Sequence, residues 1–170
     1  MTLTSDGAPA TATVNGSPYA IVASAAIGSG LGIQNVNNIR IIREFDAPPA
    51  KVFRAHTDAN LYAQWLGPHG STTDVENFDC RTGGSYRFVM RGDGYTAWFR
   101  GCFHEIRENE LIIQTFTYEE VPDGVALERL TFEDIGGGRT RLTTTSLVDS
   151  FEGRDAFVAS GMESGVREGY

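Results

Sequence analysis

Hydrophobic and polar residues alternate with a period of two from Tyr86 to Phe103. Aromatic and sulfur-containing side chains hold every second position at first, and arginines hold several positions between them. Strict alternation predicts a strand whose two faces differ. Because Gly92-Asp93-Gly94 interrupts the pattern, we expect an antiparallel hairpin. One face should meet water, and the other, bulky and apolar, must be covered by another part of the chain.

Further short apolar or alternating runs predict five more strands, at 39–46, 72–81, 111–118, 126–134 and 140–147. Two short helices are expected after the first of these strands. Pro49 opens one that ends at Thr57, and Asp58 caps a second that runs through Trp65. The later strands are joined by short, turn-rich connections, which predicts an antiparallel meander.

A last helix is predicted over 154–168, with Asp149 or Ser150 as its N-cap. It contains Gly161 and Gly165, although a helical glycine costs about 1 kcal/mol relative to alanine. Such glycines suit a helix that lies close to another backbone or leaves room for something. The order of elements predicts an α+β fold, in which a curved antiparallel sheet of about seven strands wraps around a long C-terminal helix.

Residues 1–37 differ from the rest of the chain, because they are rich in small residues and contain one acidic and no basic residue. We expect an N-terminal extension that is partly disordered, above all over residues 1–13. A strand or packing arm is expected near Tyr19–Ile27. The folded domain is therefore predicted to cover residues 38–170.

The length of 170 residues fits one domain with a real core. The net charge of -8 argues against nucleic acids and anionic membranes as partners. With no apolar run of about 18 residues and no basic residue before Arg40, we expect neither a membrane span nor a secretory signal, and a cytoplasmic location. Cys80 and Cys102 lack metal spacing, so they are expected to be buried free thiols.

Candidate catalytic groups are few. His56, His69 and His104 are separated and lack metal spacing, so structural or solvated roles are expected. No nucleophile elbow or phosphate loop is evident, and no metal or cofactor is expected. Glu105 and Glu128 share the parity of apolar neighbours, but burying a charge is costly, so we expect both to reach water near strand ends. No catalytic residue is assigned.

Several short motifs follow one another along residues 39–170. They are Arg43-Glu44-Phe45-Asp46-Ala47-Pro48, Trp65-Leu66-Gly67-Pro68, Gly83-Gly84-Ser85-Tyr86-Arg87-Phe88, Phe99-Arg100-Gly101 and Gly161-Met162-Glu163-Ser164-Gly165. In this order they resemble the activator of Hsp90 ATPase homologue-like (AHSA1-type) branch of the START-like (SRPBCC) helix-grip superfamily, which also contains polyketide cyclases and self-resistance proteins. The resemblance implies a Bet v 1-like fold with its site between the long helix and the concave sheet.

Large side chains and helix glycines favour a ligand cavity there over a filled core. Its predicted lining is Trp65, Phe78, Tyr86, Phe88, Met90, Phe99, Phe103, Phe157, Gly161 and Met162. The expected function is to bind an apolar or aromatic small molecule. The alternatives are a polyketide cyclase-like or self-resistance enzyme acting on such a ligand, and a chaperone ATPase activator-like interaction domain. A polar side chain aimed into the cavity would favour the enzyme, and both enzymatic activity and a homodimer stay open.

Overall fold

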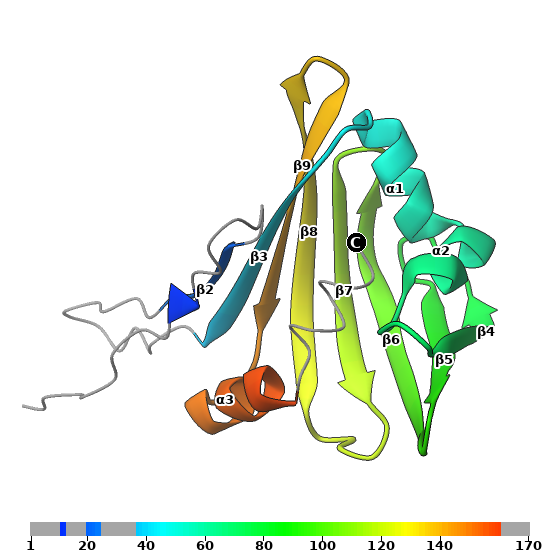
Figure 1. Ribbon diagram of the computed structural model, residues 1–170, viewed down its shortest axis with the longest axis vertical. Coiled ribbons are helices and arrows are strands. Elements are labelled where there is room, and N and C mark those ends of the chain that lie inside the picture. Colours follow the sequence, from blue (N-terminus) through cyan, green and yellow to red (C-terminus); the bar gives the residue numbers. More distant parts are fainter. Residues whose placement is uncertain (1–10, 13–19, 25–36, 161–170) are drawn as a thin grey trace, which may run out of the picture.

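The computed structural model describes residues 11–12, 20–24 and 37–160, which form one sheet and three helices (Figure 1). The strands are β1 (Thr11–Ala12), β2 (Ala20–Ser24), β3 (Asn38–Phe45), β4 (Thr72–Phe78), β5 (Ser85–Gly92), β6 (Tyr95–Arg107), β7 (Leu111–Tyr118), β8 (Val125–Gly136) and β9 (Arg139–Leu147). The helices are α1 (Pro49–Thr57), α2 (Ala59–Trp65) and α3 (Phe151–Ala159).

The sheet has the strand order β1-β2-β3-β9-β8-β7-β6-β5-β4, and every neighbouring pair is antiparallel. Strands β3 to β9 are the seven strands that the alternating pattern predicts, so the α+β helix-grip class is confirmed. Strand β2 pairs with β3 inside the range expected for a strand or packing arm. The disorder predicted for residues 1–13 falls mostly outside the described residues.

The pairing register gives the curved sheet two unlike faces. Phe88 on β5 lies opposite Phe99 on β6, and both side chains pack on the concave side of the sheet. Helices α1 and α2 cover this side (Figure 1). Arg87 and Arg91 point to the opposite, convex face, as their alternation with aromatic residues predicts. The concave face therefore holds the main core cluster, and the convex face carries the arginines, although Val89 on that face is also buried.

The first two helices form where the sequence predicts them. Pro49 stands in the first turn of α1, and the Asp58 carboxylate caps α2 by accepting hydrogen bonds from the backbone amides of Asn60 (3.0 Å) and Leu61 (3.2 Å). Helix α1 buries Phe53 against Phe132 of β8, with ring centroids 5.3 Å apart. These contacts fix both helices over one part of the sheet.

Helix α3 begins at a predicted cap, because the Ser150 hydroxyl oxygen accepts a hydrogen bond from the Gly153 amide at 2.9 Å. It lies at the end of the sheet opposite α1 (Figure 1), and its half-buried Phe157 lies 6.4 Å from the Phe116 ring. The predicted continuation of this helix to Glu168 lies outside the described residues. No helix in the described part of the chain combines the length and apolar character that crossing a membrane requires.

Both cysteines are free thiols, but their burial differs from the prediction. Cys80 is half-buried, whereas Cys102 is exposed. Cys102 alternates on β6 with the buried Gly101 and Phe103, so its side chain points to the convex face. The expectation of two buried thiols is therefore wrong for Cys102.

Candidate functional site

Beneath α1 and α2, the concave face is filled by side chains. Phe88 is 0% exposed, and its ring centroid lies 5.2 Å from that of Phe99 and 5.8 Å from that of Tyr62 on α2. Seven residues of the predicted cavity lining belong to this packed cluster or lie against it: Trp65, Phe78, Tyr86, Phe88, Met90, Phe99 and Phe103. This part of the face is a core.

Toward α3, the concave face carries aromatic side chains that are only half-buried. Phe99 and Phe116 stack with their centroids 5.2 Å apart, and Phe157 of α3 approaches Phe116. Met90, also half-buried, lies at the edge of the packed cluster. Gly161 and Met162, the other predicted lining residues, lie outside the described residues. We call this region, Phe99, Phe116 and Phe157, the aromatic floor.

A row of three polar side chains crosses the concave face beside the aromatic floor. Gln114 on β7, Glu128 on β8 and Ser146 on β9 occupy one level of the pairing register. The Gln114 amide nitrogen Nε2 donates to Glu128 Oε2 at 2.9 Å, and Ser146 Oγ lies 3.1 Å from Glu128 Oε1. Both partners are buried, Gln114 at 9% and Ser146 at 2% exposure. The carboxyl group is thus held between two neighbouring strands.

Burial raises the pKa of the Glu128 carboxyl, and the two hydrogen bonds, from Gln114 and Ser146, offset this rise in part. No cation of the described residues contributes to that balance. Desolvation also raises the pKa of the nearby Tyr86 well above its ordinary value, with smaller contributions from Tyr62 and Glu128. The Tyr86 hydroxyl donates to the Thr115 carbonyl oxygen at 2.8 Å. The site therefore favours protonated, neutral forms of its acids.

Asn37 adds an acceptor next to the polar row. It precedes β3 and shares a face with Ile39, which lies opposite Ser146. Asn37 is 8% exposed, and its Oδ1 atom has no hydrogen-bond partner among the described residues. A buried acceptor without a partner costs about 1–3 kcal/mol, so a donor supplied by a ligand would be favourable there.

Of Glu105 and Glu128, which were both expected to reach water, Glu128 is half-buried, and its carboxyl is held on the concave face by Gln114 and Ser146. Strand β8 continues without a break through this level, so Glu128 keeps the inward parity of Leu130 and Phe132. The parity was the signal for its inward position. In β6 the register shifts between Phe103 and Glu105, so Glu105 leaves the apolar face and forms an ion pair with Arg107 at 3.1 Å. Gln114 and Ser146 were missed, although they also alternate with apolar residues.

The histidines agree with the structural or solvated roles expected for them. His56 is buried between Trp65 and Phe132, with centroid distances of 4.8 and 5.4 Å, and its Nδ1 atom lies 2.8 Å from the Val52 carbonyl oxygen. Burial lowers the pKa of His56 from 6.5 to about 4. His104 is exposed, as its place on the convex face predicts. The described residues contain no group of three side chains that could hold a metal ion.

Solved structures share this fold at moderate sequence identity. An NMR structure of a protein from Arthrobacter aurescens is 27% identical, has a TM-score of 0.71, and matches 78% of this chain and 80% of that chain. A crystal structure of a protein from Rhodobacter sphaeroides is also 27% identical, with a TM-score of 0.71, and matches 86% and 92% of the two chains. An HSP90 activator from Plasmodium falciparum is 22% identical, with a TM-score of 0.50, over 65% of this chain and 71% of that chain, which shows the fold alone.

No curated protein matches the chain. The model of one protein family, however, matches residues 46–170, which is most of the sequence. This range takes in α1 and α2, the aromatic floor and the polar row, and it agrees with the resemblance carried by the ordered motifs. The chain therefore belongs to the family described as activator of Hsp90 ATPase homolog 1-like proteins.

Proposed function

We propose that this protein binds a small, mainly aromatic molecule that carries a hydrogen-bonding group, on the concave face between the aromatic floor and the polar row. Stacking on Phe99 and Phe116 would hold the ring system, since aromatic pairs at such spacings add about 0.5–1.5 kcal/mol beyond the area they bury. Glu128 and Asn37 would bind the polar group.

The observation that carries this proposal is the placement of Glu128. A carboxyl group buried without a cation is unfavourable for stability, because its desolvation is not offset by an opposite charge. A purely structural position would be served as well by an apolar residue such as the neighbouring Leu130. Two strands nevertheless supply Gln114 and Ser146 to orient this one carboxyl. Such an oriented group gives a ligand pocket its specificity.

The proposal is tested by thermal unfolding and calorimetric titration with a hydroxylated anthraquinone and its unsubstituted parent. We expect the hydroxylated compound to bind more tightly to the wild-type protein, and Glu128→Leu to remove that preference. Glu105→Gln is the matched control, because it changes a solvated carboxylate on another strand and should leave both affinities unchanged. If Glu128→Leu does not fold, Glu128→Gln should bind with an affinity that no longer varies with pH. Absence of saturable binding by either compound would refute the proposal.

A second candidate is an enzyme that rearranges such a ligand, and the inward Glu128 is the observation that favours it. A carboxyl with a raised pKa can donate a proton to a carbonyl oxygen of a bound substrate and recover one from the product. Holding a folded polyketide-like chain would supply much of the rate by proximity. Glu128→Gln would then keep ligand binding while product formation falls by about 100-fold or more. Unchanged product formation would exclude this role for Glu128.

A chaperone-interaction role is the remaining alternative. It is supported by the family description and by the fold shared with an HSP90 activator from Plasmodium falciparum. Adding this protein to a purified Hsp90-type ATPase should raise the rate of ATP hydrolysis if the role is correct, and an unchanged rate would exclude it.

A further inference from the structure

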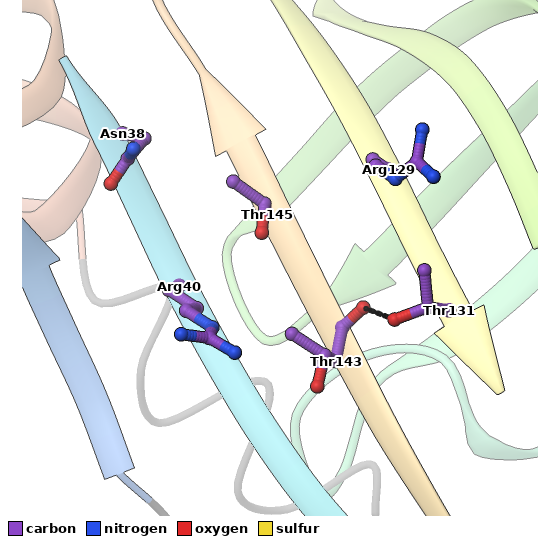
Figure 2. A pocket seen from close by; sticks show the side chains of 6 residues that line it. All are labelled: Asn38, Arg40, Arg129, Thr131, Thr143 and Thr145. Carbon is purple, nitrogen blue, oxygen red and sulfur yellow. Dashed lines mark hydrogen bonds between the residues drawn. The ribbon is translucent and has the colours of Figure 1, made fainter. Parts of the chain in front are cut away.

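The convex face of the sheet has a depression of its own, on the side opposite Glu128. Its volume is about 360 Å³, and β3, β8 and β9 supply its lining. The residues are Asn38, Arg40, Arg129, Thr131, Thr143 and Thr145 (Figure 2). All of them alternate with residues of the concave face, so this site shares strands with the polar row but no side chains.

The register places the two arginines on either side of one threonine. Thr145 on β9 lies opposite Arg40 of β3 and opposite Arg129 of β8. Since neighbouring strands are about 4.8 Å apart, the two arginine Cα atoms are separated by about 10 Å. Figure 2 shows Thr143 and Thr145 on the central strand between them, with Thr131 Oγ1 donating to the Thr143 carbonyl oxygen at 3.4 Å. Two guanidinium groups therefore border a floor of hydroxyl groups.

A second cluster on the same three strands has the opposite arrangement of charge. There Arg141 of β9 lies between Glu44 of β3 and Glu133 of β8, with ion pairs of 3.0 and 3.2 Å. At the level of Thr145, two cations flank a neutral residue. The positions of Arg40 and Arg129 correspond to those of the two glutamates, but no anion stands between them.

Arg40 and Arg129 are exposed, and neither forms an ion pair with another residue in the part of the chain that the structure describes. This is unusual in a chain with 22 acidic and 14 basic residues, in which most of the described arginines are paired with carboxylates. The nearest carboxylates on this face of the two strands, Glu44 and Glu133, already contact Arg141. The depression is therefore locally cationic on an acidic protein.

We propose that this depression binds a phosphate monoester with an apolar substituent. A tetrahedral phosphoryl group carries two negative charges and presents oxygens in several directions, so it can accept paired hydrogen bonds from both guanidinium groups. A planar carboxylate can form paired hydrogen bonds with only one guanidinium group at a time. The hydroxyl groups of Thr143 and Thr145 supply further donors. Leu127 and Leu147, 45% and 38% exposed, lie opposite each other one level along the same face and would contact the substituent.

Phenyl phosphate is the probe, titrated by calorimetry at low salt, with inorganic phosphate for comparison. We expect saturable binding of phenyl phosphate, weakened about tenfold or more by Arg40→Gln or by Arg129→Gln. Arg100→Gln is the matched control, because Arg100 is an exposed arginine on the convex face that lies on β6, away from the depression. This substitution should change the affinity less than about twofold. Leu127→Ser should weaken the binding of phenyl phosphate and leave the affinity for inorganic phosphate unchanged.

Two results would overturn the proposal. One is no saturable binding of phenyl phosphate to the wild-type protein. The other is an equal loss of affinity in Arg100→Gln, Arg40→Gln and Arg129→Gln, which would show a diffuse charge effect. The proposed anthraquinone site on the concave face is tested independently, because Glu128→Leu should keep full affinity for phenyl phosphate.

Discussion

Replacing Phe88 by alanine tests whether the concave face is packed beneath α1 and α2 and more accessible toward α3. Phe88 is 0% exposed and lies against three other rings, at centroid distances of 5.2 to 6.0 Å. Removing a fully buried phenylalanine loses its burial and leaves a cavity, at a cost of about 3–5 kcal/mol. Phe116 is half-buried and stacks on one side, so Phe116→Ala should cost about 1–2 kcal/mol.

Urea unfolding followed by tryptophan fluorescence measures both costs, since Trp65 lies against the packed cluster. Thermal unfolding gives a second measure, because each kcal/mol of lost stability lowers the melting temperature of a chain of this size by about 2–4 °C. The melting temperature should therefore fall by about 6–20 °C for Phe88→Ala and by about 2–8 °C for Phe116→Ala. Phe116→Ala should also weaken the binding of the hydroxylated anthraquinone. Equal, large destabilisation by both substitutions, with no change in ligand binding, would show that the whole face is closed core and refute this division.

Three further predictions concern groups near the site. His56 stays neutral when folded, so stability should be highest above pH 6.5 and decline as the pH falls toward 4, by at most about 3 kcal/mol, and His56→Gln should lose this dependence in urea unfolding. The pH dependence of stability that Glu128 contributes has the opposite sign. Its pKa is raised from 4.5, so stability should decline as the pH rises above that value, and Glu128→Gln should flatten the decline. Gly101→Ala should destabilise by about 1–3 kcal/mol or more in the same assay, because an added Cβ would stand 2.0 Å from the Thr115 carbonyl oxygen and 2.6 Å from the Tyr86 hydroxyl.

Local patterns were sufficient to predict most of the fold. The alternation around Phe88 gave its strand and its inward face, and the turn signals gave the antiparallel order. Asp58 and Ser150 marked helix starts because capping is a short-range interaction between a side chain and nearby amides. These features depend on residues within a few positions of one another, which is why they could be predicted from one sequence.

The candidate site depends on contacts between strands, which the sequence does not display. Glu128 is held by Gln114 and Ser146, which lie 14 and 18 residues away and meet it through the register of β7 and β9. The shift between Phe103 and Glu105 likewise has no local signal, yet it turns Glu105 to the opposite face. The cost of burying a charge was a sound general argument, but it could not account for partners supplied by other strands.

Glu128 and Arg129 show how the sheet makes two sites from one pair of neighbours. In the sequence they look like a solvated pair of opposite charges that cancel. In a strand, successive side chains point to opposite faces, so the carboxyl enters the concave face and the guanidinium the convex face. Neither can neutralise the other through the sheet, and neither has another charged partner among the described residues. Each face of β8 therefore carries an ionisable group without a charged partner, and this separation is why we infer a ligand of different chemistry on each side.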